Sequence, residues 1–370
     1  MKTKKIVLTG GPCAGKTTAL TELEKEFTEK GYQVLMVPEA ATILINSGIR
    51  PFGPHKLKTV DFQRQVIKLQ LTLEDLALET AKKTKCPSII LCDRGILDDK
   101  AYVTKEEWQQ LLKEFDTTDL NIMNRYDSII HLRTAALGKE EFYTLDNNSA
   151  RTETVDEARQ KDKDTLASWL GHEKLKIIGN ESTFEDKIKA VVKEVYHTLS
   201  KPYPIQIQRK FIISDISLDD LEDNKLVKLD IEQYVINSGN IEYTFRKTTK
   251  DNETTYTLLT KIDTDIDNER VRTSRKITEE EYYQNLSEEE KPIRKTRYCF
   301  EYQNNYFRLD IFEQGLILLE IEPTTKEEKI ALPSFLTIKE EVTNNKDYRN
   351  SSLYERLNFK QKGSAKVRSL

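Results

Sequence analysis

The sequence predicts two domains of different fold: an α/β domain with a doubly wound parallel sheet, followed by a mainly antiparallel β domain. Up to about residue 180, short runs of β-branched residues alternate with helical patterns. Beyond about residue 205, alternating strands are separated by polar turns. Pro202 and Pro204 stiffen the junction. The predicted ranges are 1–200 for the first domain, 201–204 for a linker, 205–355 for the second domain and 356–370 for a basic tail.

The first domain is expected to contain five buried strands, because short continuous apolar runs are typical of parallel strands covered on both faces. The runs are residues 6–8, 34–37, 88–92, 128–132 and 175–178. A predicted helix over residues 62–81 is expected to bury Val66, Leu69, Leu73 and Leu76. A last helix, with Ser182 and Glu185 as its capping box, is expected to turn Phe184, Ile188, Val191 and Val195 toward the sheet.

The second domain is expected to consist of strands with a helical insert near residues 279–286. Because side chains alternate along a strand, Glu320 and Glu322 share one face of their strand, and Lys295 and Arg297 share one face of theirs. On pattern alone, such a polar face is expected in water, as in a β-sandwich. Phe307, Leu309 and Ile311 are expected on an apolar face. The predicted strands are residues 206–213, 241–247, 255–262, 270–276, 296–302, 306–312 and 316–322.

Composition restricts the class of function. The 370 residues include 58 Lys and Arg against 62 Asp and Glu, a net charge of −4, which argues against general nucleic-acid binding. No apolar run approaches the ~20 residues of a transmembrane segment, and no signal segment precedes the first strand. A cytoplasmic protein is therefore expected. The four cysteines form no CxxC pair, so neither a disulfide framework nor a zinc site is indicated.

The segment that follows the first strand matches the phosphate-binding pattern GxxxxGK[ST]. Its glycines let backbone amides surround a phosphate, and Lys16 is expected to reach the β- and γ-phosphate oxygens. Thr17 is the expected Mg²⁺ ligand. ATP and GTP remain equal candidates. The predicted nucleotide-binding residues are Gly10, Gly11, Pro12, Cys13, Ala14, Gly15, Lys16, Thr17 and Thr18.

Two carboxylates follow predicted strands at the edge where parallel sheets bind ligands. Asp93, at the end of the third strand, is expected to hold the magnesium shell, and a turn-forming aspartate is the alternative. Glu39 follows the second strand and could accept a proton from an acceptor hydroxyl. It could equally stabilise the next helix through its dipole. Arg94 is a weaker candidate for catalysis, because most arginines are simply exposed.

A polar stretch over residues 147–160 is interpreted as a lid over the phosphates. Arg151 is the favoured candidate for stabilising the transferred charge, and Arg159 is expected to be an ordinary exposed side chain. The four histidines are spread along the chain and are expected to be structural or surface residues.

Residues 1–200 resemble the nucleoside and nucleotide kinases among P-loop proteins, specifically the AAA-domain group related to nicotinamide riboside kinases. The resemblance implies phosphoryl transfer to a small molecule, with Asp93 or Glu39 near the acceptor. The matching residues are the P-loop, Pro38-Glu39-Ala40, Asp93-Arg94-Gly95, Asp98, Tyr102, Tyr126-Asp127, Asn147 and Arg151.

Residues 205–355 resemble the CYTH or triphosphate tunnel family, in which an eight-stranded barrel lined by charges binds triphosphate-like anions. The likeness places the polar face in a lumen instead of in water. Gln206 and Gln208 stand where that family has two metal-binding glutamates, which puts metal-dependent hydrolysis in doubt. Glu320 and Glu322 remain as metal candidates. The expected anion-binding residues are Lys210, Arg246, Lys261, Arg272 and Arg297.

Three functions are therefore open. The first is a P-loop phosphotransferase or NTPase whose barrel binds a small phosphorylated or polyphosphate ligand. The second is a nucleotide-dependent switch whose barrel binds anionic phospholipid headgroups, since the pairing of domains is similar to GTP- and phospholipid-binding proteins. The third is a triphosphatase. Mg²⁺ is the expected cofactor of the P-loop.

Overall fold

The computed structural model describes residues 3–84, 86–140, 154–199, 207–216, 226–263, 270–286, 290–323 and 328–358. The chain divides into two compact units, Met1–Leu199 and Ser200–Leu370. Each unit has its own sheet and its own core, and each is described by itself. No helix in these ranges is long and apolar enough to cross a membrane.

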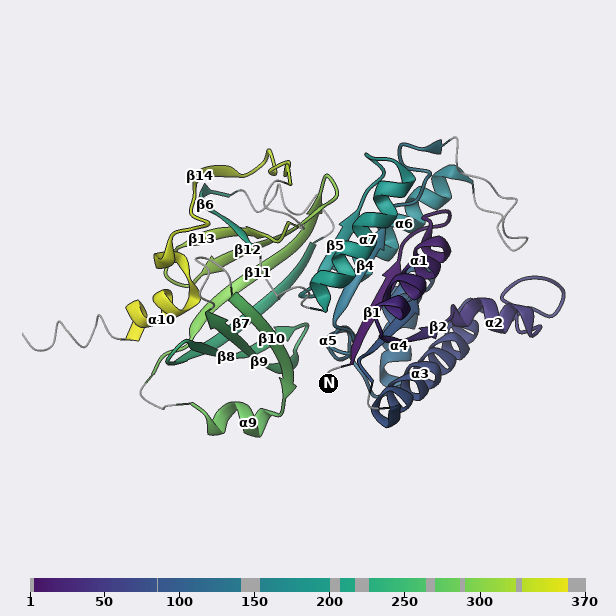
Figure 1. Ribbon diagram of the computed structural model, residues 1–370, viewed down its shortest axis with the longest axis horizontal. Helices are drawn as coiled ribbons and strands as arrows, with labels where there is room; N and C mark the ends of the chain where they lie inside the picture. Colours follow the sequence, from purple (N-terminus) through teal and green to yellow (C-terminus); the bar gives the residue numbers. More distant parts are fainter. Residues whose placement is uncertain are drawn as a thin grey trace, which may run out of the picture. The chain divides into compact units, whose positions relative to one another are not determined.

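The first unit is built on a parallel sheet of five strands, in the order β2-β3-β1-β4-β5 (Figure 1). All four strand pairs are parallel, as the continuous apolar runs predict. The strands β1, β3 and β4 are almost wholly buried. The prediction of a doubly wound sheet is confirmed. The strands are β1 (Lys4–Thr9), β2 (Gln33–Val37), β3 (Ser88–Asp93), β4 (Ser128–Leu132) and β5 (Leu175–Ile178).

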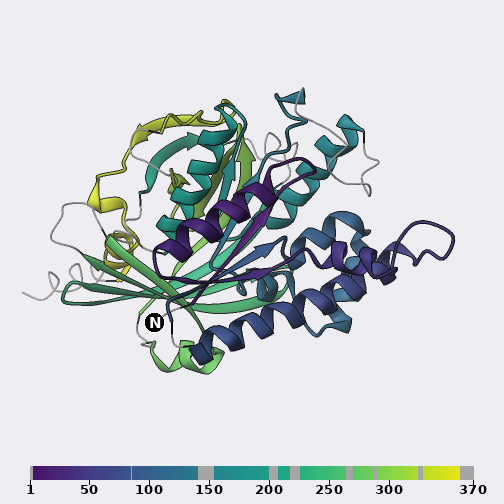
Figure 2. The ribbon, with the colours of Figure 1, turned by 45° about the vertical axis from the view of Figure 1, so that its right-hand side comes forward.

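Helices cover both faces of this sheet. Apolar side chains of α1 and α7 share one core cluster with β1, β3 and β4, and the two helices lie side by side (Figures 1 and 2). The helix α3 contacts β2, β3 and η1, and α6 also contacts η1. The helices are α1 (Lys16–Glu29), α2 (Ala40–Asn46), α3 (Thr59–Thr84), η1 (Ile96–Tyr102), α4 (Lys105–Glu114), α5 (Asp119–Met123), α6 (Val155–Trp169) and α7 (Phe184–Thr198).

Two helix predictions are wrong in detail. The α3 helix buries Phe62, Gln63, Val66, Ile67, Gln70 and Glu74, whereas Leu76 is 55% exposed and Leu73 is half-buried. The buried face of α3 therefore includes Gln70 and Glu74, which make buried polar contacts, in place of Leu73 and Leu76. Thr183, one residue later than predicted, caps α7 by accepting from the amide of Asp186. Phe184 is 53% exposed and is therefore not a core residue.

The second unit contains one sheet of nine strands, in the order β10-β9-β8-β7-β11-β12-β13-β6-β14. All its strand pairs are antiparallel, which confirms the predicted class. The strands are β6 (Arg209–Asp215), β7 (Leu226–Ser238), β8 (Ile241–Lys250), β9 (Glu253–Asp263), β10 (Arg270–Ile277), β11 (Ile293–Tyr302), β12 (Asn305–Phe312), β13 (Ile317–Ile321) and β14 (Thr337–Glu341). The helices are α9 (Glu279–Gln284), η3 (Lys346–Tyr348) and α10 (Asn350–Asn358).

The strand register places the buried charged residues of this sheet on one face. Directly paired residues share a face, and the pairs Lys210–Glu320, Arg297–Asp310 and Lys261–Glu242 lie on it. We call this face the polar lumen. Its charged and amide residues include Lys210, Gln233, Glu242, Arg246, Lys261, Arg272, Lys295, Arg297, Arg308, Asp310, Glu320 and Glu322.

The sheet curls around this face. Arg272 on β10 lies 3.3 Å from Glu322, which directly follows β13. In a flat sheet, strands six places apart would be separated by about 29 Å. The polar face is therefore the inside of a curved sheet, as the family resemblance implies, and not a surface in water (Figure 1). The side chains of Lys295 and Asp310 have no exposed surface at all.

Apolar side chains cover the outside. Phe307 and Leu309 are fully buried in a cluster with Phe300 and Leu319, as their predicted apolar face requires. Residues of the segment 330–338 pack on this cluster from outside. Near β8, the helix α9 contributes the buried Tyr282 to a second outer cluster. The charged interior is thus enclosed by an apolar outer shell.

Several features of this unit differ from the prediction. The 13-residue strand β7 and the short β14 were not predicted, so the sheet has nine strands in the described ranges instead of the seven expected from the pattern. Charged residues on the outer face of β7 hide its alternation. The basic tail predicted over residues 356–370 begins too early, because α10 continues to Asn358, which is buried and hydrogen-bonded to Lys291. The strand β6 begins at Arg209, and Gln206 lies outside the described residues.

Candidate nucleotide site and charged lumen

The P-loop connects the end of β1 at Thr9 to the start of α1 at Lys16. Gly10 and Gly15 have φ values of 139° and 87°, a region that favours glycine. An ideal Cβ on Gly10 would stand 2.0 Å from the carbonyl oxygen of Leu132, so a side chain has no room there. The glycines of the motif are therefore needed both for the turn and for its close approach to β4.

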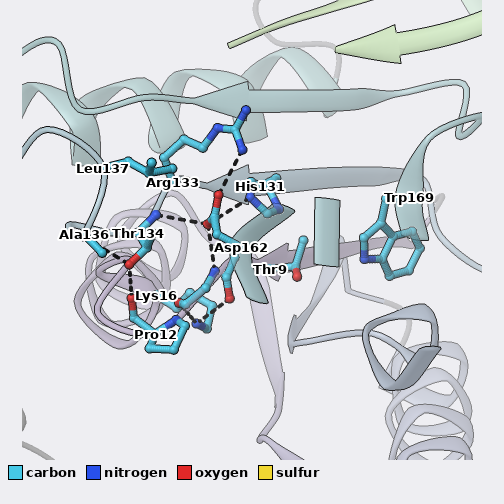
Figure 3. Close-up of polar contacts among 12 residues, drawn as sticks. Thr9, Pro12, Lys16, His131, Arg133, Thr134, Ala136, Leu137, Asp162 and Trp169 are labelled. Carbon is cyan, nitrogen blue, oxygen red and sulfur yellow. Dashed lines mark hydrogen bonds and ion pairs between the residues drawn. The ribbon is translucent and has the colours of Figure 1, made fainter. Parts of the chain in front are cut away.

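Asp162 of α6 holds the P-loop against the end of β4 (Figure 3). Its Oδ1 accepts from the amide of Gly11 at 3.0 Å and from the amide of Thr134 at 3.0 Å. Its Oδ2 accepts from Arg133 at 2.9 Å. The hydroxyl of Thr134 donates to the carbonyl of Pro12. The shape of the loop therefore depends on a helix that lies about 150 residues further along the chain.

The charge of Asp162 is well compensated. Burial alone would raise the pKa of this carboxyl, but His131 and Arg133 outweigh that effect and hold the pKa well below its usual range. His131 is fully buried, with its Nε2 3.2 Å from Asp162 Oδ1. Asp162 thus acts as a fixed negative charge behind the loop.

Lys16 points its amine at the loop itself. The Nζ donates to the carbonyls of Gly10 at 3.1 Å and Gly11 at 3.0 Å. Burial and the nearby Arg94 lower the pKa of Lys16 to about 8, although Asp93 and Glu39 act in the opposite direction. A phosphate group near this amine would restore the charged form.

Asp93 lies at the carboxyl end of β3, as predicted. Its Oδ1 is buried and has no hydrogen-bond partner. Burial raises the pKa of Asp93 despite the opposing charge of Lys16. A buried, unsatisfied carboxylate oxygen is costly unless a cation or a ligand uses it. Together with the exposed hydroxyl-bearing Thr17, this donor set fits a hard cation such as Mg²⁺.

Glu39 and Arg94 form an ion pair beside the loop. Arg94 Nε lies 2.5 Å from Glu39 Oε1, and Thr42 donates to Glu39 Oε2 at 2.6 Å. Burial alone would raise the pKa of Glu39, but Arg94, Thr42 and Lys16 lower it to about 2. Glu39 is also the N-cap residue of α2, although its side chain makes no capping hydrogen bond. A carboxylate with such a low pKa is a weak general base. The contact of Glu39 with Arg94 indicates instead that Glu39 positions this arginine.

Arg94 contacts the P-loop and directly precedes Gly95 and the short helix η1, which ends at Tyr102. It has a left-handed backbone, with a φ of 72°, and its Nη1 lies 3.5 Å from the Gly10 carbonyl. Burial alone would lower the pKa of Arg94, but Tyr102 and Glu39 hold it well above its ordinary value. Tyr102 lines a cleft of about 610 Å³. The other lining residues are Pro51, Lys56, Leu57, Lys58, Thr59, Ala101, Val103, Thr104 and Glu107.

A second buried lysine fixes the loop after β5. Lys187 Nζ donates to the Arg133 carbonyl and to Asn180 Oδ1, both at 2.7 Å. Asn180 Nδ2 donates to the carbonyls of Thr134 and Leu137 at 2.8 and 2.9 Å. Burial lowers the pKa of Lys187 to about 8, with Asp162 opposing. The loops after β4 and β5 therefore form one bonded unit beside the P-loop.

The remaining predicted residues of this unit have other roles. Arg151 and Asn147 lie outside the described residues. Arg159 was expected to be an ordinary exposed side chain, but it is half-buried, donates to the Ala136 carbonyl and pairs with Glu140 and Asp156. Asp98 accepts from Thr9 and from Trp169, so its carboxylate is used within the core.

Sequence reasoning missed Asp162, Arg133, Thr134 and Lys187. Arg133 and Thr134 directly follow β4, so the strand-end argument that selected Asp93 could have selected them as well. Asp162 lies within a helix and carries no local signal, because its partners come from distant segments.

The polar lumen of the second unit is a network of buried ion pairs. Glu320 lies 3.0 Å from Lys210 and 3.3 Å from Arg297. Asp310 accepts from Lys295 at 2.5 Å and from Arg297 at 2.6 Å. The other pairs are Arg308–Glu322, Arg272–Glu322 and Lys261–Glu242. The predicted cations Lys210, Lys261, Arg272 and Arg297 are thus brought together, and Arg246 shares their face.

Positive charge exceeds negative charge in this lumen. The lumen residues named above include seven Lys or Arg side chains and four carboxylates. Burial alone would raise the pKa of Glu320, but Lys210 and Arg297 hold it well below its ordinary value. Burial lowers the pKa of Lys295 to about 8. Gln233 adds a fully buried amide whose Oε1 and Nε2 have no partner.

Comparison with known protein families supports the assignment of a P-loop domain in the first unit. Residues 5–187 match the family model described as an AAA domain. No curated protein matches the chain. Among solved structures, the hypothetical protein NE1496 is 23% identical, with a TM-score of 0.30, over 40% of this chain and 97% of that chain. The inorganic triphosphatase NE1496 is 22% identical, with a TM-score of 0.29, over 40% of this chain and 93% of that chain. Both likenesses are weak, and the fold of the second unit is established by its own strand order.

Proposed function

We propose that the first unit is an NTP- and Mg²⁺-dependent phosphotransferase that acts on a small acceptor. The observation that carries the proposal is the buried, unpartnered Oδ1 of Asp93 next to Lys16 at the P-loop. Such an oxygen is stabilised when Mg²⁺ or its bound water occupies the loop. Thr17 and Asp93 would hold the ion, which would neutralise charge on the phosphates.

The chain's own residues divide the remaining tasks. Lys16 and the loop amides bind the phosphates, and Asp162 keeps the loop in shape from behind. Arg94, fixed by Glu39, can neutralise charge on the transferred group. The cleft lined by Tyr102 has a volume suited to a small acceptor, and Tyr102 ends the helix η1 that begins two residues after Arg94. Arg151 remains a candidate for a further cation.

The test is release of ADP or GDP with a panel of nucleosides, nucleotides and phosphorylated metabolites as acceptors. Acceptor-stimulated turnover is expected for the wild-type protein and is expected to vanish in Lys16→Ala. Tyr102→Phe, which keeps the ring and removes a hydroxyl from the lining of the cleft, should alter the KM for the acceptor more than that for the nucleotide. Turnover that no acceptor stimulates would remove the phosphotransferase and leave a simple NTPase.

A second function belongs to the polar lumen. We infer that it binds a phosphorylated or polyphosphate anion, because the seven cations named for it exceed the four carboxylates that lie among them. Its carboxylates already lie in ion pairs with Lys or Arg, which favours anion binding over a metal-dependent triphosphatase. Tripolyphosphate titrated into Lys16→Ala protein should release heat, and phosphate release in that variant would favour hydrolysis. Sedimentation with vesicles containing phosphatidic acid, with and without nucleotide, tests the lipid-binding switch.

A further inference from the structure

Phe184 lies directly beside the P-loop. It is the first residue of α7, and an ideal Cβ on Gly15 would stand 2.6 Å from Cε2 and 3.1 Å from Cζ of its ring. One edge of the ring therefore packs on the glycine that precedes α1. Phe184 is nevertheless 53% exposed, so much of the ring remains open to solvent.

This position distinguishes Phe184 from the other exposed apolar side chains of the described ranges. Those are Ile49, Phe52, Leu57, Leu76, Ile236 and Tyr283. None of them is among the atoms nearest to the P-loop glycines. Single exposed apolar residues are ordinary, but an exposed aromatic ring in contact with a phosphate-binding loop lies within reach of the ribose and base of a nucleotide bound there.

The segment before Phe184 is fixed by hydrogen bonds. Thr183 caps α7, and Asn180 and Lys187 tie the segment to the carbonyls after β4. The Asn180 amide donates to two carbonyls and its oxygen accepts from Lys187. The polar atoms of Asn180 are therefore engaged within the protein, and they hold the start of α7 in place beside the P-loop.

We propose that Phe184 is a stacking platform for the nucleotide base, so that the P-loop ligand is a purine nucleoside triphosphate and not an inorganic polyphosphate. The inference rests on the proposed nucleotide site and deepens it. Phosphates bound by the loop amides direct the ribose and base along the flank of the loop, where the exposed ring lies. Stacking accepts any base with a π-face and is stronger for larger rings. ATP and GTP therefore bind with similar affinity, and both bind more tightly than CTP.

The test measures nucleotide affinity with a fluorescent ATP analogue labelled on the ribose, in the full-length protein with Mg²⁺. Signal that persists in Lys16→Ala is subtracted, because it does not come from the P-loop. Unlabelled ATP, GTP, CTP and tripolyphosphate then compete for the same site. Phe184→Ala is expected to raise the Ki of ATP and GTP about tenfold, a change of about 1.4 kcal/mol. The Ki of tripolyphosphate is expected to stay unchanged, which also shows that the loop is intact.

Two variants serve as controls. Phe184→Trp keeps a flat ring and should restore the affinity for ATP, whereas Leu76→Ala removes an equally exposed apolar side chain on α3 and should change nothing. An unchanged Ki of ATP in Phe184→Ala would overturn the proposal. Equal weakening of ATP and tripolyphosphate would also overturn it, because Phe184 would then merely support the loop. The proposed function fails separately, if wild-type protein binds no nucleotide or Lys16→Ala binds it equally well.

Discussion

The lowered pKa of Lys16 predicts that nucleotide binding takes up a proton. The pKa of about 8 in the free protein arises from burial and from Arg94. The phosphates of a nucleotide bring opposite charge to the amine, so its pKa rises on binding. At pH 8 about half of the free protein carries an uncharged Lys16, and binding should therefore take up about half a proton. At pH 7 the uptake should fall to about 0.1 proton, and at pH 9 it should approach one.

The same pKa fixes the pH dependence of affinity. Because the charged amine binds phosphate, the apparent Kd should rise about fivefold between pH 8 and pH 9 and change little below pH 7. Calorimetry in two buffers of different ionisation enthalpy, such as HEPES and Tris, measures the uptake directly. Burial of an ammonium also lowers stability at neutral pH, and the loss is relieved as the pH rises from about 8 toward the ordinary lysine value.

Lys16→Arg is the matched control, because a guanidinium stays charged throughout this range. Binding to this variant should show no buffer dependence. Uptake that persists in Lys16→Arg would point to Lys187, whose pKa is also about 8. Nucleotide binding by the wild-type protein without any buffer dependence at pH 8 would refute the assigned environment of Lys16.

Three further predictions concern buried charges. Asp93→Asn should lower kcat at least 100-fold and leave the protein at least as stable as wild type at pH 7, because the raised pKa of Asp93 means that its ionised form costs stability above the ordinary pKa of the group. Turnover and urea denaturation measure the two effects, and an unchanged kcat would contradict the role of Asp93. Asp162→Asn should lower the free energy of unfolding by about 3 kcal/mol and weaken nucleotide binding, because Arg133 loses the charge of its buried partner. The control is Asp156→Asn, on the same helix but exposed, which should change the free energy of unfolding by less than about 0.5 kcal/mol. Glu320→Gln should also destabilise the protein by about 3 kcal/mol but tighten tripolyphosphate binding in a Lys16→Ala background, because Lys210 and Arg297 lose a competing carboxylate. Glu341→Gln, which changes an exposed pair with Arg209, is the control. Weaker tripolyphosphate binding in Glu320→Gln would argue against anion binding in the polar lumen.

The sequence alone was sufficient for the phosphate-binding loop and for the class of each sheet. Both signals are local: the loop needs glycines and a lysine at fixed spacing, and buried parallel strands need continuous apolar runs. Asp93 could be placed for the same reason, since it directly follows a strand. The strand β7 was missed because its outer face is charged, and Phe184 was assigned to the core because helical spacing does not show where a helix begins to leave the sheet.

Only the tertiary structure decided which charges meet. Asp162 and Gly11 are far apart in sequence, and their contact depends on the packing of α6 against the end of β4. Arg272 and Glu322 lie on strands that meet only because the sheet curls. Alternation along a strand shows which side chains share a face, but curvature is a property of the whole sheet, so the sequence pattern by itself could not tell a solvated surface from an enclosed lumen.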